Sequence, residues 1–386
     1  MTRVVSDGIG RDVLVTPSPV AMVWQGEGRP HEALAVPGVS LAPGELLVEV
    51  ELATVCGSDV HTVLGHRHAP TPLVLGHEQV GRVTAVGEGA VASDGTPLIV
   101  GMRVVWSVTV SCGSCDRCSR GLAEKCRALA KYGHDRVHRG WELSGGFATH
   151  VQVRAGSTVV LVDEALPAAV AAPASCATAT VAAALEAAAD RVRLAGATVV
   201  VLGAGLLGIT ATAMATDAGA RVVVSDPDPL RRSAALSFGA AAVADSRSGF
   251  RSATGLGGVL ATLTASGAAE PLIVLEMSGS TAAVSTAMNL VGVGGVIVLV
   301  GSVSPSDGIR LDPETLVRGL ITVRGVHNYA ARHLISAVDY LEHAWYRYPF
   351  AQLVGNTFPL ALVDDALALA ATGTHQRVAL DPHLGA

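Results

Sequence analysis

The sequence predicts an α/β protein of two domains, in which a strand-rich domain accompanies a doubly wound parallel sheet. Three observations carry this prediction. The chain has 386 residues, which is enough for two domains. Val-rich stretches separated by Gly and Pro fill the region from Ala21 to about Val162, which is typical of short strands. From Ala197 onward, apolar strand patterns alternate with helical ones, which is typical of βαβ units.

Composition excludes several classes of protein. Half of the residues are hydrophobic but only 4% are aromatic, so the core must consist mainly of Ala, Val, Leu and Ile. The net charge is −6 and no basic block is present, which argues against a nucleic-acid partner. No apolar run reaches the roughly 18 residues of a membrane helix, and no secretory signal opens the sequence. We therefore expect a cytoplasmic protein with no membrane partner.

The first domain is predicted to be a small β-barrel. Residues 1–20, which include Pro17 and Pro19, are expected to be a loosely held N-terminal extension. Closely spaced glycines suggest strongly curved strands, which favour a barrel over an open sheet. The predicted strands are Ala21–Trp24, Glu45–Leu52, Gln79–Val86, Met102–Val110 and Thr149–Val153.

The stretch Cys56–Gly81 gathers side chains that suit zinc. It begins with C-G-S-D-V-H and ends with G-H-E-Q-V-G, and its glycines favour turns that fold it back on itself. Thiolate, imidazole and carboxylate groups are all zinc ligands. We predict that this stretch forms most of one metal site, with candidate ligands Cys56, Asp59, His61, His77 and Glu78.

Four more cysteines follow the pattern C-x2-C-x2-C-x7-C. Three disulfides would fit the even cysteine count of a secreted protein, but the absent signal and the long chain favour metal binding. Four thiolates so close together would enclose a tetrahedral zinc with no open position, which makes the site structural. An iron–sulfur cluster is the rival interpretation, although its bacterial signature has closer spacing and a following proline. The four residues are Cys112, Cys115, Cys118 and Cys126.

A dinucleotide site is predicted where the second domain begins. The apolar run Thr198–Leu202 precedes G-A-G-L-L-G, and a helical stretch and a strand then lead to Asp226. Glycines at this strand–helix turn let the backbone approach a pyrophosphate, which the helix N-terminus attracts. Asp226 would bind the ribose diol and repel a 2′-phosphate, which favours NAD over NADP; the alternative is an ordinary turn aspartate. Arg231 and Arg232 would soften that preference.

The junction and the rest of the chain complete this outline. Alanine-rich Pro167–Ala189 is helical in composition, is interrupted by Pro173, and contains the last cysteine, Cys176. The tail from Phe350 is expected to rejoin the first domain. A sheet of about six strands is implied, with strands Leu272–Met277, Val296–Val300 and Ile321–Val326 and helices Thr281–Val291 and Ala331–Ala344.

Together these motifs resemble the zinc-dependent alcohol dehydrogenases of the medium-chain dehydrogenase/reductase superfamily. The resemblance rests on G-H-E-x-x-G, C-G-S-D-x-H, the four-cysteine lobe and the dinucleotide fingerprint in that order. It implies a GroES-like catalytic domain (21–177 and 327–386, with the zinc lobe at 112–126) and a Rossmann domain (178–326), with the active site in the cleft. It also implies a homodimer or homotetramer with Val296–Val300 near the subunit contact, a small alcohol, aldehyde or ketone substrate, NAD, and two zinc ions per chain.

The resemblance implies roles for single residues as well. Cys56, His77 and Cys176 would hold the catalytic zinc, and Glu78 would ligate it or lie just behind it. The other implied roles are orientation of His77 by Asp59, a proton relay through Ser58 and His61, a nicotinamide contact from Thr180, and cofactor contacts from Gly203, Gly205, Leu206, Gly208 and Arg231. Gly57 stands where some members have an arginine on the pyrophosphate; Arg377 is the candidate replacement.

The substrate is the least determined expectation. The strings K-Y-G-H (131–134), D-P-D-P-x-R-R (226–232) and G-V-H-N-Y (325–329) are similar to a bacterial subgroup associated with phosphonate metabolism, which makes a hydroxyalkylphosphonate a candidate. Cationic side chains at His66, Arg67 and His68 would favour an anionic substrate, and solvated loop charge is the alternative. Rival functions are a polyol, amino-alcohol or threonine-type dehydrogenase and a non-catalytic dinucleotide-binding protein.

Overall fold

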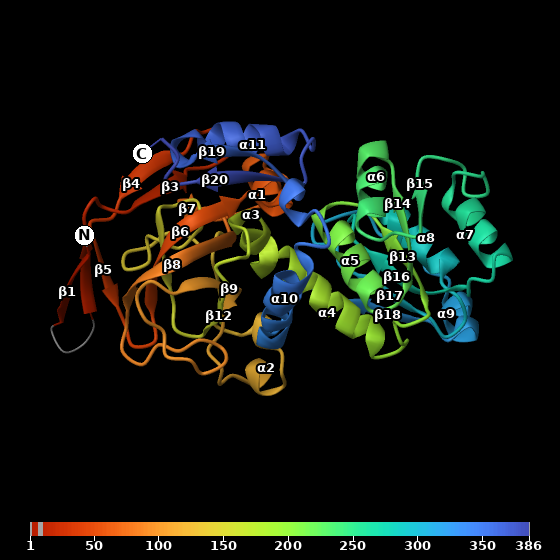
Figure 1. Cartoon of the computed structure of the whole chain (residues 1–386), viewed down its shortest axis with the longest axis horizontal. Coiled ribbons are helices and arrows are strands. Elements are labelled where there is room, and N and C mark those ends of the chain that lie inside the picture. Colours follow the sequence, from red (N-terminus) through yellow and green to blue (C-terminus); the bar gives the residue numbers. More distant parts are fainter. Residues whose placement is uncertain (1, 7–10, 386) are drawn as a thin grey trace. The chain divides into compact units, whose positions relative to one another are not determined.

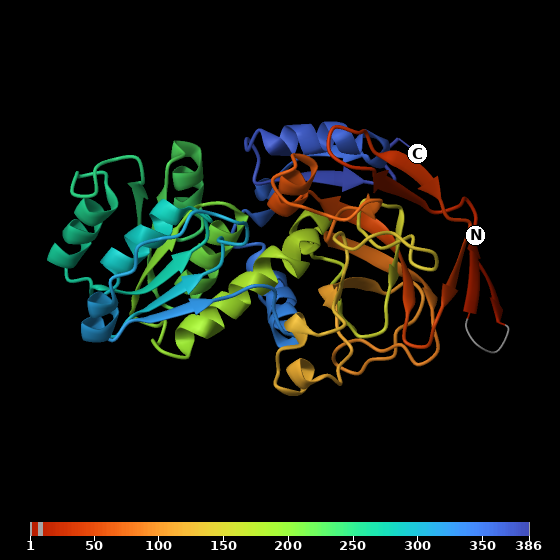
Figure 2. The same ribbon diagram turned by 180° about the vertical axis from the view of Figure 1, so that it is seen from behind.

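The structure, a computed structural model, describes residues 2–6 and 11–385 and divides the chain into two compact units (Figures 1 and 2). The first unit comprises Met1–Ala179 with Ala330–Ala386, and the second comprises Thr180–Tyr329.

The first unit is built on an eight-stranded sheet and two three-stranded sheets. The main path of the large sheet is β10 (Ala130–Lys131), β9 (Arg103–Val110), β8 (Glu78–Val86), β6 (Leu46–Thr54), β20 (Arg377–Asp381) and β19 (Val354–Pro359), with β11 (His150–Val153) added on β6 and β12 (Ser157–Leu161) on β9. The small sheets are β1 (Thr2–Ser6), β2 (Arg11–Val15) and β5 (Gly38–Leu41), and β4 (Glu32–Ala35), β3 (Val20–Trp24) and β7 (Leu73–Val74).

Short helices connect these strands. The α-helices are α1 (Gly57–Val63), α2 (Asp116–Ser119), α3 (Ala168–Ala171), α10 (Ala331–Ala344) and α11 (Val363–Ala371), and the 3₁₀ helices are η1 (Ala123–Lys125), η2 (Ala172–Ser175), η3 (Phe350–Leu353) and η4 (Leu360–Leu362). The C-terminal residues return to the large sheet, where Ala379 of β20 lies opposite Thr54 of β6, which in turn lies opposite Glu78 of β8. Three strands that are distant in sequence therefore meet where the predicted metal ligands lie.

The expectation of a loosely held N-terminal extension is wrong for Arg11–Val15. These residues form β2, which pairs with β5, and Val13 is fully buried in a cluster with Leu41 and Leu47. The expectation rested on Pro17 and Pro19 and overlooked the alternating apolar residues Val13 and Val15. Such alternation gives a short strand one buried face. Residues 1 and 7–10 of the extension lie outside the described residues.

The second unit is a six-stranded parallel sheet, which confirms the predicted doubly wound fold. Its strand order is β15 (Ala242–Asp245), β14 (Arg221–Asp226), β13 (Thr198–Leu202), β16 (Pro271–Glu276), β17 (Val296–Leu299) and β18 (Thr322–Gly325). Its helices are α5 (Leu206–Asp217), α6 (Pro229–Ser237), α7 (Leu256–Ala265), α8 (Thr281–Leu290) and α9 (Pro313–Gly319), and α4 (Ala177–Ala189) enters it from the first unit.

The strand order fixes where a ligand can bind and which edge is free. The chain leaves β13 toward β15 on one side and resumes at β16 on the other, so the crevice for a ligand opens beside the carboxyl end of β13. Because β17 pairs on both sides, β18 forms the outer edge of this sheet among the described residues.

Within the described residues, no single helix combines the length and apolar character needed to cross a membrane. The segments Ala168–Ser175 and Ala177–Ala189 meet that test only when joined, and they are bent by 54° at their junction.

One buried histidine gives the fold a predictable pH dependence. Burial lowers the pKa of the His150 imidazole on β11 to about 4. The unfolded chain binds this proton near pH 6.5, so stability is retained above about pH 6.5 and is lost as the pH falls through about 4. We expect His150→Gln to flatten this loss by up to about 3 kcal/mol in urea unfolding across that range. His343→Gln on the exposed side of α10 is the control, and equal pH slopes for His150→Gln and wild type would contradict the prediction.

Candidate metal centres and dinucleotide site

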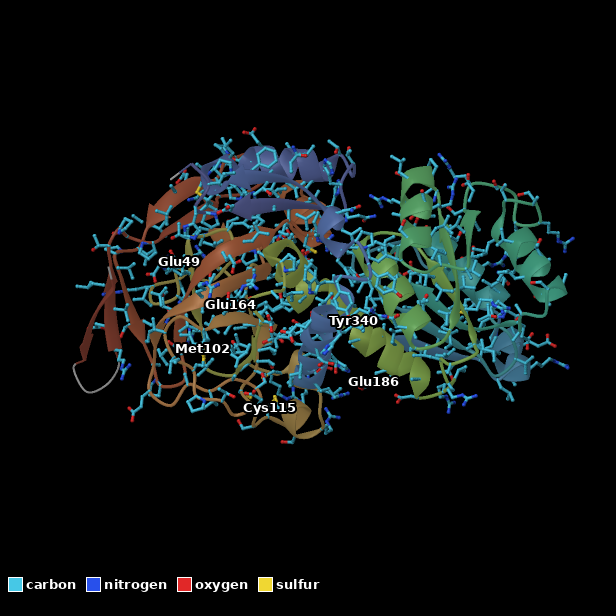
Figure 3. The ribbon with its side chains drawn as sticks, in the orientation of Figure 1. Glu49, Met102, Cys115, Glu164, Glu186 and Tyr340 are labelled. Atoms are coloured by element: carbon cyan, nitrogen blue, oxygen red, sulfur yellow. The ribbon has the colours of Figure 1, made fainter. Side chains whose placement is uncertain are left out.

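The four predicted lobe cysteines form one sulfur cluster. Cys115 begins the segment around α2, and Figure 3 shows it there at the edge of the first unit. Sγ–Sγ distances are 3.5 Å for Cys115–Cys118, 3.9 Å for Cys115–Cys126 and 3.4 Å for Cys112–Cys126. Tetrahedral zinc with Zn–S bonds of about 2.3 Å separates its sulfurs by about 3.8 Å. The cluster therefore has the spacing of a closed, structural zinc site.

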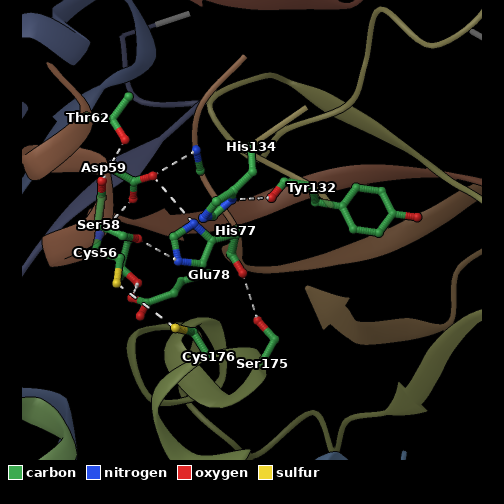
Figure 4. Close-up of polar contacts among 12 residues, drawn as sticks. Cys56, Ser58, Asp59, Thr62, His77, Glu78, Tyr132, His134, Ser175 and Cys176 are labelled. Atoms are coloured by element: carbon green, nitrogen blue, oxygen red, sulfur yellow. Dashed lines mark hydrogen bonds and ion pairs between the residues drawn. The ribbon is translucent and has the colours of Figure 1, made fainter. Parts of the chain in front are cut away.

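A second group brings together residues from three segments of the chain. The ligand atoms of Cys56, His77, Glu78 and Cys176 all lie within 4.8 Å of one another, and Figure 4 shows these side chains converging. The sulfurs of Cys56 and Cys176 are 4.0 Å apart although 120 residues separate them in sequence. Two sulfurs and an imidazole nitrogen at this spacing match the ligand preferences of zinc.

Local structure explains how the first ligand is positioned. Cys56 precedes α1, and the Asp59 carboxylate in the first helical turn accepts a hydrogen bond from the Cys56 amide at 2.9 Å. The other Asp59 oxygen lies 3.4 Å from Nδ1 of His77 and 3.4 Å from the amide of Gly76. One buried carboxylate thus binds the backbone of one candidate ligand and lies next to the ring of another, and orientation of His77 by Asp59 stays a prediction.

The Glu78 carboxylate is already hydrogen-bonded to two side chains, so it is not free to coordinate a metal ion. Its oxygens accept hydrogen bonds from Nε and Nη2 of Arg377 at 2.6 and 2.7 Å, and from the Thr54 hydroxyl at 2.7 Å. Glu78 is fully buried, and Arg377 is nearly so. Arg377 also lies 3.7 Å from the Cys56 sulfur. The guanidinium is therefore committed to this network, and the predicted pyrophosphate contact of Arg377 is not what this geometry favours.

The charges of the cluster suit a bound cation. A hydrogen bond from the Cys176 thiol lowers the pKa of Cys56 well below its usual value, and the charges of Arg377 and His77 add to this effect. Burial opposes a charge on His77, yet Asp59 and Cys56 outweigh it and raise the pKa of the imidazole to about 10. Two sulfurs, one of which deprotonates readily, and an imidazole that favours positive charge form a donor set that fits zinc.

Ser175 links the distant ligand to the others. Its hydroxyl donates to the backbone carbonyl of His77 at 3.1 Å and is fully buried (Figure 4). This bond fastens η2, which leads directly into Cys176, to the start of β8. No sequence pattern predicts this hydrogen bond, because Ser175 is a small residue beside a cysteine and belongs to no recognisable motif.

The predicted relay residues lie on one side of α1. The Ser58 hydroxyl is 3.4 Å from Nε2 of His77, and His61 follows three residues later on the same helical face. Among the described residues no hydrogen bond joins Ser58 to His61; the His61 ring instead meets His66, with their Nδ1 atoms 3.5 Å apart. The relay remains a prediction.

The residues of the predicted dinucleotide site gather at the carboxyl end of β13. A cavity of ≈ 450 Å³ is lined there by Gly203, Asp226, Asp245 and Phe250 among others. Gly203 has φ +101, and a Cβ on Gly208 would collide with the carbonyl oxygen of Gly203, so both positions require glycine. Gly205 immediately precedes α5 and Leu206 begins it, which directs the amides of that helix terminus toward an anion.

Asp226 ends β14 in a fixed orientation. Its oxygens accept hydrogen bonds from the amides of Ala204 at 2.7 Å and Asp228 at 2.8 Å. Arg232 reaches back to this turn: its guanidinium donates to the Asp226 carbonyl at 2.8 Å and lies 3.4 Å from Asp245. Arg231 contributes its amide to the cap of α6. A carboxylate with a second acid nearby favours a ribose diol over a 2′-phosphate.

We expect Asp226→Ala to weaken NAD use and to raise the ratio of NADP to NAD activity. The change removes acceptors for the ribose hydroxyls and a negative charge, which together are worth about 10–100-fold in kcat/KM for NAD. Steady-state kinetics with both cofactors measures the ratio, and the thermal midpoint checks that the turn held by Ala204 survives. An unchanged ratio in a folded variant would exclude the assigned role of Asp226.

Comparisons with known proteins agree with this geometry. Residues 42–164 match the family model "Alcohol dehydrogenase GroES-like domain", and residues 207–342 match "Zinc-binding dehydrogenase". The chain is 31% identical to 5-exo-hydroxycamphor dehydrogenase of Pseudomonas putida over 92% of this chain and 96% of that protein. It is also 31% identical to an L-threonine 3-dehydrogenase of a Chelativorans species, over 78% and 82% of the two chains.

Solved structures show the same fold. The alcohol dehydrogenase of Thermotoga maritima superposes with a TM-score of 0.87 at 27% identity, covering 95% of this chain and 100% of that one. An alcohol dehydrogenase from Thermus sp. ATN1 gives a TM-score of 0.79 at 26% identity, covering 94% and 99%.

Proposed function

Because the chain belongs to the zinc-dependent alcohol dehydrogenases of the medium-chain dehydrogenase/reductase superfamily, we propose that it transfers a hydride between an alcohol and NAD at a zinc centre held by Cys56, His77 and Cys176. The convergence of these three side chains on one point carries the proposal. Three protein ligands leave a fourth position for a substrate oxygen, unlike the closed four-cysteine lobe.

The chemistry divides between the bound groups and the chain. Zinc would polarise the oxygen of the substrate as a Lewis acid, and NAD would accept or supply the hydride. The Ser58 hydroxyl lies close to Nε2 of His77. We propose that Ser58 exchanges the proton of the substrate hydroxyl. His61, one turn further along α1 and exposed, is the residue through which we propose that this proton reaches solvent. Thr180, one turn after Cys176, is proposed to contact the nicotinamide.

Glu78 is proposed to act behind the zinc and not as a resting ligand. Its carboxylate already accepts three hydrogen bonds, so coordination would require it to give up part of the Arg377 pair. Removing one partner of a buried ion pair is costly. The Glu78–Arg377 ion pair, which carries no net charge, instead lies next to Cys56.

A hydroxyalkylphosphonate, or another anionic alcohol, is the proposed substrate within this activity. The similarity of three short strings and the cationic loop after α1 support it. A threonine-type or polyol substrate is the alternative, and the curated relatives include L-threonine 3-dehydrogenases. We also propose a cytoplasmic location and a homodimer or homotetramer. Exposed Leu320 and Val323 at the edge strand β18 support association of two copies there.

A screen for NAD reduction over alcohols, diols, L-threonine and hydroxyalkylphosphonates tests the activity. The expected result is turnover that requires zinc and is lost on treatment with a chelator that removes about one zinc per chain. Zinc analysis of the purified protein should give about two ions per chain. A wild-type protein that holds only about one zinc would contradict the catalytic centre.

A further inference from the structure

The turn that follows the zinc lobe lies directly against the candidate catalytic centre. Gly133 has φ +71, and a Cβ there would lie 2.5 Å from the carbonyl oxygen of Gly76, so the turn packs on the backbone that precedes His77. The ring of His134 meets the ring of His77 edge-on, with centroids 4.8 Å apart. Lys131 begins this turn at the end of β10, and its carbonyl accepts the amides of His134 and Asp135.

The loop after α1 folds back toward the same centre. The amide of Arg67 donates to the carbonyl of His61 at 3.0 Å, which folds the loop back on the helix that begins after Cys56. His66 is occupied by its contact with His61, and His68 is exposed. Of the three loop residues predicted to face a substrate, Arg67 is therefore the one whose side chain is partly buried and makes no hydrogen bond or ion pair among the described residues.

Arg67 and Lys131 are cations on two separate segments that both pack beside the candidate centre. Among residues 2–6 and 11–385, neither side chain has a hydrogen-bond or ion-pair partner, whereas Arg82, Arg103 and Arg377 each bind a glutamate. The Asp135 carboxylate nearby accepts the backbone amide of Lys131.

The two charges act on each other and on the centre. Burial, then the charges of Arg67 and Lys125, lower the pKa of Lys131, and the charges of Asp135 and Cys176 oppose this shift without cancelling it. Burial holds the pKa of His134 well below its usual range, and the positive charges of His77, Arg67 and Lys131, in decreasing order, add to this effect.

Two like charges that are partly withdrawn from water disfavour each other, and an anion between them would relieve that cost. Unpaired cations next to reactive groups are a common sign of a functional site. The donors of Arg suit a carboxylate or phosphonate, and Lys adds a compact charge.

We propose that Lys131 and Arg67 bind the anionic group of the substrate, so that this protein selects hydroxyacids or hydroxyphosphonates over neutral alcohols. The inference rests on the proposed alcohol dehydrogenase activity. It assigns anion recognition to two residues from separate segments of the first unit, and it leaves His66 and His68 outside the contact.

The test compares kcat/KM for three alcohols of similar length: 3-hydroxypropylphosphonate, 4-hydroxybutanoate and 1-butanol. Wild type is expected to favour at least one anionic alcohol over 1-butanol by tenfold or more. Lys131→Met and Arg67→Gln should each lower that preference by about tenfold, as expected for loss of a charge-assisted hydrogen bond. The two anionic arms distinguish a carboxylate from a phosphonate. Arg318→Gln, which changes an arginine that is 80% exposed on α9, is the matched control.

A binding measurement separates this inference from the proposed activity. Methylphosphonate and acetate are titrated into the zinc-loaded protein by calorimetry, and we expect at least one to bind and Lys131→Met and Arg67→Gln to weaken it about tenfold. If 1-butanol is oxidised as well as the anionic alcohols and neither anion binds, the inference is wrong while the dehydrogenase activity stands. If no alcohol reduces NAD, the proposed dehydrogenase activity is wrong. The calorimetric titration alone then tests whether Lys131 and Arg67 bind an anion. Variants that lower all three kcat/KM values equally, with unchanged anion binding, would also overturn the inference.

Discussion

Replacing Cys56 by serine is expected to abolish turnover while leaving the fold intact. A serine hydroxyl is a poor replacement for a thiolate as a zinc ligand, and only His77 and Cys176 would remain. Zinc content should fall from about two ions per chain to about one, because the four-cysteine lobe is untouched. Metal analysis, circular dichroism and NAD reduction on the same sample measure the three consequences.

The matched control is Cys118→Ser in the lobe. It should also remove about one zinc, but it should lower the thermal midpoint, because a closed four-thiolate site contributes to folding. Normal activity in Cys56→Ser, or a zinc content that stays at about two, would refute the assignment of the catalytic centre.

Replacing Arg377 by methionine is expected to destabilise the protein by about 3–5 kcal/mol. The change leaves the Glu78 carboxylate, which is fully buried, with only the Thr54 hydroxyl of the three hydrogen bonds described above. Urea unfolding at neutral pH and fixed zinc concentration measures the loss. The double variant Glu78→Gln/Arg377→Met should recover part of it, because no uncompensated charge is then buried.

A surface pair provides the contrast for this measurement. Arg82 and Glu164 make a short bidentate contact, but both side chains are substantially exposed. Arg82→Met should therefore cost less than about 1 kcal/mol. If Arg377→Met costs no more than Arg82→Met, the buried pair does not stabilise the fold as inferred.

Contiguous motifs carried most of what was predictable. The four lobe cysteines lie within fifteen positions, so their spacing alone indicates a closed metal site, and the structure brings their sulfurs together. The glycine fingerprint between Thr198–Leu202 and the following helix likewise predicted the crevice beside β13. Both signals are local, because the residues that act together are joined by a few peptide bonds.

The less predictable parts depend on long-range strand pairing. Arg377 meets Glu78 across 299 residues because β20 pairs with β6, and β6 pairs with β8. Sequence spacing encodes the period of a helix or strand, but not which distant strand will lie alongside it. For the same reason the sequence suggests a pyrophosphate contact for Arg377 and does not indicate the buried pair that it forms with Glu78.

Local sequence patterns are sufficient to predict the fold class, the family resemblance and the donor types, because periodicity and motif spacing are local properties of the chain. The tertiary structure decided which donors meet, that Ser175 fastens Cys176 to the strand of His77, and that Glu78 is committed to Arg377. It also brought the segments of Arg67 and Lys131 to the candidate centre, and neither side chain forms an ion pair within the residues that the structure describes. Charge and burial are properties of neighbours in space, and packing alone determines which residues become neighbours.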